Sequence, residues 1–393
     1  MKILILSDIE TAGEWILTQT IVEQLKKRDK LEFFLLAYGK NKIHLQENLF
    51  EKIILINRTP LIAPFRYYRQ ILLEFILGVR SLNQIKKITG QTDYVVTTNE
   101  YSLFISSLLV FPFSKNIFCV QGLRHTDNQN LENFNLYLLI RKFLERFAWF
   151  ISQKIVVPSD KAKNIVEKEL GIFSRIKKVK IIPNIISEYF FVKHTPVDLF
   201  IFREKINLPK DSKIILYSGR IDSIKGIKNL LSSFIQLRRK IKKANLIIAY
   251  TDVKADKQLF NSLIKIVKDN RINQFVYFIK DLPRKELPLL YQNADCAVFP
   301  SYIEMDSLAL REGLSSGTPV FSTDTGNAKK LLEKVDNFFI LKNNSPKKIL
   351  DSLIKFFTKS KVWHKNIKKK IRDLVGNELA KNNSIREYEK LLH

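Results

Sequence analysis

The chain has 393 residues, 46% of them hydrophobic, which excludes a disordered chain and supplies apolar material for two cores. Lysine and arginine total 66 against 39 aspartates and glutamates, and the net charge of +27 predicts an anionic partner: a phosphorylated substrate, a membrane surface or nucleic acid. No stretch reaches the roughly 18 apolar residues of a membrane-spanning helix, and the first apolar run is too short for a secretory signal.

The first half of the chain alternates short β-branched runs with longer helical patterns. A helical pattern from residue 14, EWILTQTIVEQLKKR, and another from residue 160, DKAKNIVEKEL, lie between such runs. Continuous apolar strands separated by helices predict a parallel sheet that is covered on both faces. The predicted strands of this half are residues 3–7, 33–38, 52–56, 94–98, 117–121, 154–159 and 179–184.

After about residue 210 the same alternation begins again. The helical pattern that follows the first of the new runs is IKNLLSSFIQLRRKIKK, residues 227–243. The predicted strands of the second half are residues 213–219, 245–250, 275–279, 296–301 and 319–323. We therefore predict an α/β protein with a Rossmann-like domain over 1–195, a second over 196–360, and C-terminal helices over 361–393 that pack back toward the first domain. Ligands of such folds bind at the carboxyl ends of the strands, so we expect the active site between the two domains.

The two cysteines, Cys119 and Cys296, stand far apart in apolar runs and lack CxxC spacing. We expect both to be buried, reduced thiols, which suits a cytoplasmic protein. The five histidines are scattered and none pairs at metal-ligand spacing, so we expect no metal site.

The stretch LYSGRIDSIKGIKNLL, residues 216–231, combines a strand end with two cations. A strand ends at Gly219, Arg220 and Lys225 flank a polar loop, and a helix begins near Gly226. Helix N-termini favour anions, and a guanidinium with an ammonium adds the positive charge that a diphosphate needs. The alternative is an exposed turn with incidental charge, and the spacing alone leaves both open.

The stretch EMDSLALRE, residues 304–312, places two carboxylates around one helix start. Glu304 lies in the loop after a buried strand, and Asp306 or Ser307 can cap the helix that follows. Glu312 is about two turns into that helix, roughly 9 Å along its axis. Carboxylates bind vicinal hydroxyls well, so the arrangement fits a sugar, a diphosphate and a ribose in that order. The alternative is a capping acid followed by a solvent-facing glutamate.

The two stretches together resemble the retaining glycosyltransferases of family 4, which have the GT-B fold of two facing Rossmann-like domains. The resemblance rests on Gly-Arg, four residues and Lys-Gly, followed about eighty residues later by PSY, Glu304, seven residues, Glu312 and GTPV. It extends over nearly the whole chain and takes in SDIETAGEWILTQTIVEQL, IVVPSDKAKNIVEKEL, VKIIPN, ELPLLYQNADCAVFPS and STDTGNAKKLL.

What the resemblance implies is transfer of a sugar from a nucleoside diphosphate sugar, with retention and without a metal cofactor. Arg220 and Lys225 would hold the diphosphate, Glu304 the donor sugar hydroxyls, and Glu312 the ribose. Fixed cations and a helix dipole would replace the metal ion, and the sequence has no Asp-x-Asp motif. The implied donor-binding set is Gly13, Gly219, Arg220, Lys225, Glu304, Met305, Asp306, Ser307, Leu308 and Glu312.

One departure from the family falls at the reacting sugar. The strand that resembles NIFCVQGL usually ends His-Gly, whereas this chain has Gln121. Glutamine cannot act as a general base, but a front-face retaining mechanism lets the departing phosphate take the acceptor proton. Gln121 then serves as a hydrogen-bonding catalytic group, or Arg124 or His125 takes part instead. The acceptor-side set is Gly13, Glu14, Gln121, Arg124 and His125. The other departures lie on the donor side, where we expect Met305, Asp306 and Ser307 to decide donor preference.

The charge and the segment APFRYYRQILLEFILGVR, residues 63–80, indicate an acceptor near a membrane. Interleaved aromatics, arginines and aliphatics are typical of an interfacial helix, or of an ordinary amphipathic helix that covers a sheet. We expect a glycan or lipid-linked acceptor in bacterial surface polysaccharide synthesis, such as lipopolysaccharide or capsule, and a cytoplasmic protein that binds the inner face of an anionic membrane.

Three other hypotheses remain open at this point. A catalytically impaired or partner-dependent relative would keep the fold and bind a sugar nucleotide without transfer. A nucleotide-sugar epimerase would use the same fold. A nucleic-acid-binding protein is suggested by charge alone, and no helix-turn-helix, zinc-finger or RNP-type signature supports it, so we expect no nucleic acid partner.

Overall fold

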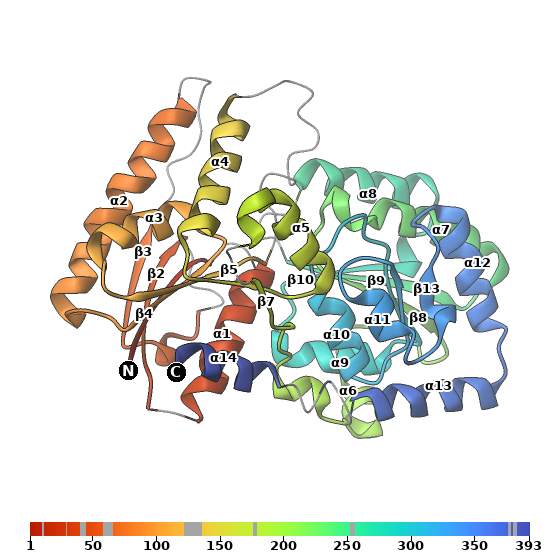
Figure 1. Ribbon diagram of the computed structural model, residues 1–393. Helices are drawn as coiled ribbons and strands as arrows, with labels where there is room; N and C mark the ends of the chain where they lie inside the picture. The colour runs from red at the N-terminus through yellow and green to blue at the C-terminus, as the bar shows by residue number, and fades with distance from the viewer. Residues whose placement is uncertain are drawn as a thin grey trace. The chain divides into compact units, whose positions relative to one another are not determined.

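The structure is a computed structural model. It describes residues 1–9, 12–28, 30–39, 45–57, 66–121, 136–175, 179–251, 256–375, 379 and 383–393. The chain divides into two compact units, one made of Met1–Ile185 with Asn383–His393 and the other of Ile186–Asn382 (Figure 1).

Unit 1 contains a sheet of seven parallel strands in the order β3-β2-β1-β4-β5-β6-β7. The strand order reverses between β1 and β4, so the carboxyl ends of these two neighbours form the switch point of the sheet. The strands are β1 Lys2–Asp8, β2 Glu32–Tyr38, β3 Lys52–Ile56, β4 Tyr94–Thr98, β5 Lys115–Cys119, β6 Lys154–Val157 and β7 Val179–Ile181.

Alternate residues of β1 assign the helices of unit 1 to the two faces of its sheet. Leu4 and Leu6 belong to a buried cluster with Leu82 and Leu103, which lie on α2 (Arg66–Thr89) and α3 (Tyr101–Val110). Ile3 and Ile5 point to the opposite face, because successive strand residues alternate. There they line a small apolar cavity with residues of α1 (Ala12–Lys26) and α14 (Ser384–Leu392). Both faces of the sheet are therefore covered, which explains why its strands are apolar throughout.

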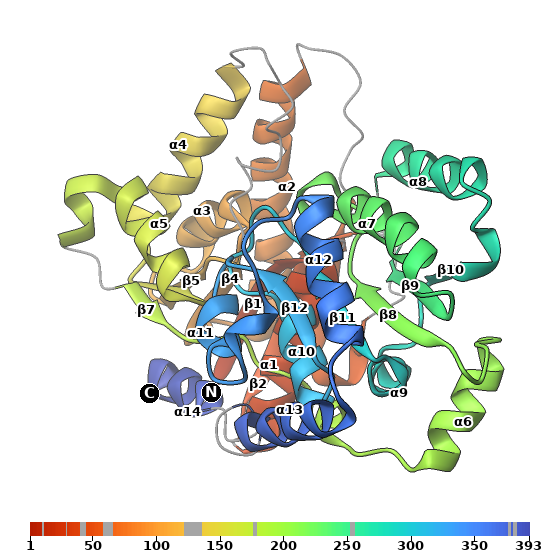
Figure 2. The ribbon, with the colours of Figure 1, turned by 90° about the vertical axis from the view of Figure 1, so that its right-hand side faces the viewer.

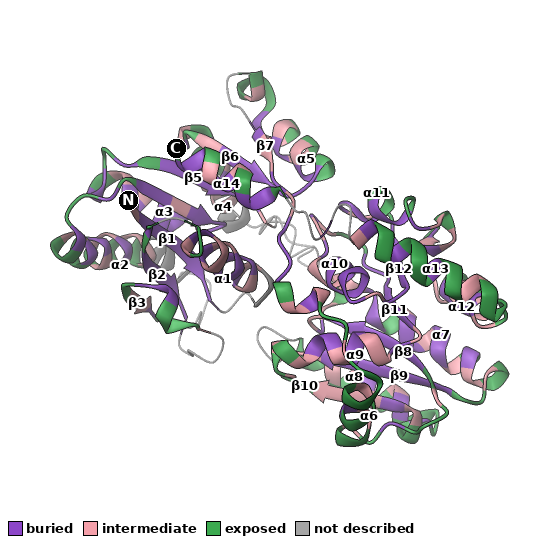
Figure 3. Ribbon diagram, turned by 90° about the horizontal axis from the view of Figure 1, so that it is seen from below, coloured by how far each residue is buried: buried purple, intermediate pink, exposed green. Residues whose placement is uncertain are grey.

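The remaining helices of unit 1 are α4 (Leu136–Ile151) and α5 (Asp160–Leu170). Burial follows the expected pattern, with the strands buried and the outer faces of helices such as α2 exposed (Figure 3).

Unit 2 contains six parallel strands in the order β10-β9-β8-β11-β12-β13, with the switch point between β8 and β11. The strands are β8 Lys213–Ser218, β9 Ala244–Tyr250, β10 Val276–Lys280, β11 Cys296–Phe299, β12 Val320–Thr323 and β13 Ile340–Leu341. The helices are α6 Pro196–Lys205, α7 Ile227–Lys240, α8 Lys257–Asp269, α9 Leu287–Asn293, α10 Leu308–Ser315, α11 Ala328–Leu332, α12 Pro346–Phe357 and α13 Lys361–Leu374 (Figure 2).

The fold prediction is confirmed, since each predicted strand corresponds to an observed one. The sequence did not predict β13, which has only two residues and so offers no period to detect. The two cysteines are free and buried, as expected.

The unit boundary differs from the predicted one at residue 195. Residues 186–195 belong to unit 2, because Ile186 and Phe190 are buried in its core. The C-terminal helices also divide: α13 contributes Ile367 and Ile371 to the core of unit 2, and α14 belongs to unit 1.

Ion pairs join α14 to the rest of unit 1. Glu389 pairs with Arg28 at 3.2 Å, and Glu387 pairs with Lys180 at 2.8 Å. The Lys154 Nζ donates to the Leu391 carbonyl at 3.1 Å, so both the side chains and the end of the helix are held.

Candidate functional site

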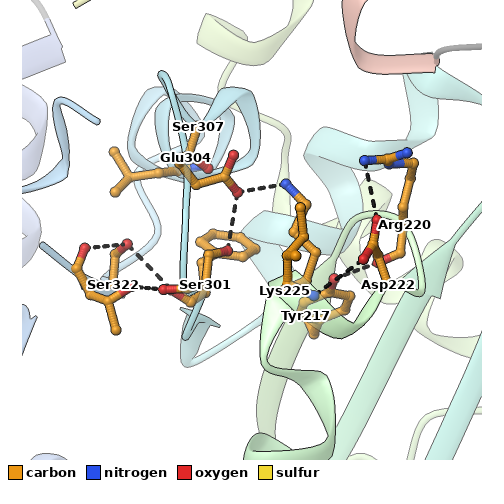
Figure 4. Close-up of polar contacts among 12 residues, drawn as sticks. Tyr217, Arg220, Asp222, Lys225, Ser301, Glu304, Ser307 and Ser322 are labelled. Atoms are coloured by element: carbon orange, nitrogen blue, oxygen red, sulfur yellow. Dashed lines mark hydrogen bonds and ion pairs between the residues drawn. The ribbon is translucent and has the colours of Figure 1, made fainter. Parts of the chain in front are cut away.

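Three of the predicted donor-side residues, Arg220, Lys225 and Glu304, gather at the carboxyl ends of β8 and β11, which flank the switch point of unit 2 (Figure 4). One loop follows β8 and carries Arg220 and Lys225. The other follows β11 and carries Glu304. Because parallel strands end at the same edge of a sheet, two loops about eighty residues apart in the sequence meet there.

Lys225 and Glu304 form a partly buried ion pair. The Lys225 Nζ lies 2.6 Å from the Glu304 Oε1, and the two side chains are 19% and 16% exposed. The Ser301 hydroxyl donates to the same carboxylate oxygen at 3.0 Å. Since both contacts fall on Oε1, the arrangement presents an ammonium and a second carboxylate oxygen side by side (Figure 4).

Arg220 is positioned by its neighbours in the loop after β8. Its guanidinium lies 3.3 Å from the Asp222 carboxylate, and its carbonyl accepts a hydrogen bond from the Tyr217 hydroxyl at 2.7 Å. Asp222 also accepts from the Ile224 amide at 3.1 Å and so caps the short 3-10 helix Ser223–Lys225. Burial raises the pKa of the Tyr217 phenol, and the carboxylates of Glu304 and Asp222 raise it further, so the phenol stays a donor.

Gly226 lets the two loops approach each other. Its φ of +67° is left-handed, and a Cβ at this position would lie 2.1 Å from the Pro300 carbonyl oxygen. The Tyr302 amide donates to the Ile224 carbonyl at 2.8 Å, and the Thr323 hydroxyl donates to the Ser301 carbonyl at 2.6 Å. These contacts fix the loop after β11 against its neighbours on both sides.

The helix predicted after Glu304 begins as expected. Ser307 is its N-cap and accepts from the Leu310 amide at 3.2 Å, and α10 follows from Leu308. The side chain of Asp306 is buried and lies 2.8 Å from Arg311 on the first turn of the helix. Met305 is also buried, and its carbonyl oxygen lies against Gly326. The side chains of Asp306 and Ser307 therefore have partners inside the protein.

Glu312 is buried, with 3% of its side chain exposed, which differs from a solvent-facing helix residue. Its Oε1 accepts a hydrogen bond from Arg284, which lies in the short 3-10 helix Arg284–Glu286 after β10. Burial lowers the pKa of Arg284, but the charge and hydrogen bond of Glu312, together with the nearby Tyr189 and Tyr291, leave it raised. The pair is therefore an ion pair inside unit 2.

A second cluster lies at the switch point of unit 1. Asn99 follows β4 with a left-handed φ of 54°, and its Nδ2 donates to the Glu14 Oε1 at 2.8 Å. The Asn99 Oδ1 accepts from the Gln121 amide at 3.0 Å. One amide side chain thus joins Glu14 to Gln121. Gly13 lies in the first turn of α1.

The acceptor-side prediction also names Arg124 and His125, and both lie outside the described residues.

Sequence reasoning missed four residues that organise these loops. Asp222 precedes a short turn, where a capping acid has a recognisable pattern. The other three each pair with a residue that the sequence had singled out: Asn99 with Glu14, Arg284 with Glu312, and Arg311 with Asp306. Only folding brings the first two pairs together, because their members lie far apart in the sequence.

Within the described part of the chain, no group of three or more His, Cys, Asp or Glu side chains is placed to hold a metal ion. None of the helices in that part combines the length and apolar character needed to cross a bilayer.

The architecture of the two units defines the GT-B class of proteins. Sucrose-phosphate synthase from Thermosynechococcus elongatus superimposes with a TM-score of 0.79 at 16% identity, covering 100% of this chain and 98% of that one. The Anabaena protein HepE in complex with UDP-glucose has a TM-score of 0.75 at 14% identity, with 100% of both chains covered. WaaG, a glycosyltransferase involved in lipopolysaccharide biosynthesis, has a TM-score of 0.74 at 16% identity, covering 100% and 99%. These likenesses establish the fold.

The sequence places the chain within that class more closely. Residues 200–374 match the model of the family described as glycosyl transferases group 1. An uncharacterised glycosyltransferase of Methanocaldococcus jannaschii is 27% identical over 282 residues, 70% of this chain and 64% of that protein. D-inositol 3-phosphate glycosyltransferase 2 of Catenulispora acidiphila is 30% identical over 135 residues, 33% and 32% of the two chains. The matches span less than two thirds of these relatives' lengths. Residues 200–374, most of unit 2, are therefore similar to the group 1 glycosyltransferases.

Proposed function

We propose that this protein transfers a sugar from a nucleoside diphosphate sugar to a glycan or lipid-linked acceptor, with retention and without a metal cofactor. The observation that carries the proposal is the ion pair of Lys225 with Glu304 at the switch point of unit 2. Ligands of open α/β sheets bind outside the carboxyl ends of the strands, where these side chains lie. The solved HepE complex with UDP-glucose, which has the same fold, supports a nucleotide sugar as donor.

In the proposed reaction the bond between the sugar C1 and the diphosphate oxygen breaks while a bond from C1 to the acceptor oxygen forms. The acceptor proton passes to the departing phosphate, so Gln121 need not act as a base. Arg220 and Lys225 stabilise the charge that develops on the diphosphate. Glu304 accepts hydrogen bonds from donor sugar hydroxyls through the oxygen that Lys225 and Ser301 leave uncovered.

A panel of UDP-, GDP- and ADP-sugars tests donor binding by thermal shift. A ligand at 100 times its dissociation constant adds about 2.7 kcal/mol of stability, which raises the unfolding temperature measurably. Lys225→Ala and Glu304→Ala should abolish transfer, while Lys228→Ala, an exposed neighbour on α7, should leave it unchanged. Full activity in both site variants would refute the site assignment. Transfer that persists in excess EDTA supports the metal-free mechanism.

The acceptor proposal rests on apolar side chains exposed on unit 1. Phe143 and Phe147 of α4 are 65% and 40% exposed and stack with ring centroids 6.2 Å apart. Leu72 and Ile76 of α2 are 58% and 50% exposed, and the ends of the two helices lie side by side (Figures 1 and 2). Exposed rings and aliphatics on a strongly basic protein fit a membrane interface, where a lipid-linked acceptor for surface polysaccharide would be found.

Sedimentation with vesicles tests this surface. We expect the protein to pellet with anionic vesicles at low salt and to be released at high salt, because each lysine or arginine near the surface adds about 1 kcal/mol. Phe143→Ser with Phe147→Ser should weaken pelleting. Equal pelleting with neutral vesicles would show that charge does not contribute to membrane binding. Saturable binding to DNA at physiological salt would favour the nucleic-acid alternative.

A sugar nucleotide that binds without transfer or slow hydrolysis would instead favour the catalytically impaired relative.

A further inference from the structure

Arg284 lies beside Glu312, the glutamate that the family resemblance assigns to the ribose of the donor. It follows β10, the edge strand of unit 2, and its guanidinium pairs with the Glu312 carboxylate on α10. Arg284 keeps 29% of its side chain exposed, whereas Glu312 keeps 3%. Burying a carboxylate costs free energy of desolvation unless a cation and hydrogen bonds offset it. Arg284 supplies both.

Two aromatic residues hold the guanidinium in place. The Arg284 Cζ lies 5.3 Å from the centre of the Phe190 ring, within the range of a cation–π contact. The Tyr189 phenol lies close enough for the Arg284 charge to lower its pKa, although burial has the larger effect and leaves that pKa raised. The buried Nε–H of Arg284 has no hydrogen-bond partner among the described residues. A planar cation that is fixed on one side by a carboxylate and on another by rings has a defined orientation, and it imposes that orientation on Glu312.

We propose that Arg284 is a positioning residue of the nucleotide site, which holds the Glu312 carboxylate in an orientation that faces a ribose diol. The inference rests on the proposed function. Arg284 occupies the Oε1 side of Glu312, which leaves the Oε2 side of the carboxylate to accept from the vicinal hydroxyls of the nucleoside. Arg284 thereby acts through Glu312 on the discrimination between a ribose and a sugar that lacks those hydroxyls.

A purely structural ion pair is the competing interpretation, because the contact also joins the segment after β10 to α10. The two roles differ in what they change. A structural pair would, when broken, weaken the binding of every ligand and lower the unfolding temperature. A positioning pair affects the ribose hydroxyls and leaves the diphosphate subsite of Arg220 and Lys225 intact.

Isothermal titration separates them. The ligands are UDP, GDP and ADP, each beside its 2′,3′-dideoxy form, and inorganic pyrophosphate. We expect the wild-type protein to bind the ribose form of its nucleotide about tenfold or more tightly than the dideoxy form. Hydrogen bonds to a charged group contribute an affinity difference of this size. In Arg284→Gln the preference should fall below about threefold, with pyrophosphate affinity unchanged within about twofold.

Arg284→Lys, which keeps a cation beside Glu312, should restore part of the preference and provides the test if Arg284→Gln does not fold. Lys285→Gln is the matched control on the exposed neighbour and should behave as wild type. If Arg284→Gln keeps the full wild-type preference for the ribose form, the inference is wrong and the proposed function stands. If Arg284→Gln does not fold, the same result in Arg284→Lys leads to the same conclusion. An equal loss of pyrophosphate binding would assign Arg284 a structural role. If the wild-type protein binds none of the nucleotides, both the inference and the proposed function are overturned.

Discussion

Gly226→Ala should disrupt the candidate site by forcing apart the two loops that form it. The added Cβ would lie 2.1 Å from the Pro300 carbonyl oxygen, and real Cβ contacts stay above 3.0 Å. One loop must therefore move by about 1 Å, and a displacement of that size at a reacting centre can cost about 100-fold in rate. The same substitution also places alanine at a φ of +67°, which costs about 1–2 kcal/mol.

Gly317→Ala is the matched control for this prediction. Gly317 has a φ of +79°, but nothing lies within 4 Å of its added Cβ, so this variant carries the backbone strain without the clash. We expect Gly317→Ala to lower the unfolding temperature by about 2–4 °C and to keep nucleotide affinity. Gly226→Ala should lower it further and lose affinity for the donor. Equal behaviour of the two variants in thermal unfolding and nucleotide titration would refute the close approach of the loops.

Three further predictions concern ion pairs and thiols. A double-mutant cycle of Lys225→Met and Glu304→Gln should give a coupling free energy of about 1–3 kcal/mol in urea unfolding, and a value near zero would contradict the partly buried pair. Hydrogen bonds from two lysines lower the pKa of Glu387 from 4.5 to about 2, so its stabilisation is present above pH 4.5 and is lost as the pH falls toward 2. Glu387→Gln should thus lower the free energy of unfolding at pH 7 by about 1 kcal/mol after solvent screening, and this difference from wild type should shrink over that acidic window. A difference independent of pH would contradict the contact. Burial raises the pKa of Cys119 to about 12 and that of Cys296 well above its usual value, so neither thiol should react with a thiol reagent at pH 8 until the protein is unfolded.

Local patterns in the sequence were sufficient to predict the strands that make up the two sheets. Apolar β-branched runs such as residues 213–219 are short, continuous and bounded by polar turns, and the strands they predict are those of the structure. The start of α10 was also predictable, because a serine cap and a following apolar period lie within a few residues of each other. Such features depend on neighbours in the chain.

The contacts that organise the site required the tertiary structure. Arg284 lies 28 residues before Glu312, and Asn99 lies 85 residues after Glu14, with no local signal that joins either pair. The boundary at residue 185 likewise depends on where Phe190 packs.

The physical reason is that strand order decides which loops meet. The sequence by itself determined that Lys225 and Glu304 each follow a buried strand, and so that each lies at a carboxyl end. It did not determine that β8 and β11 are neighbours, because any of several apolar strands satisfies the same hydrophobic pattern. Only that pairing places the ammonium 2.6 Å from the carboxylate and turns two separate motifs into one site.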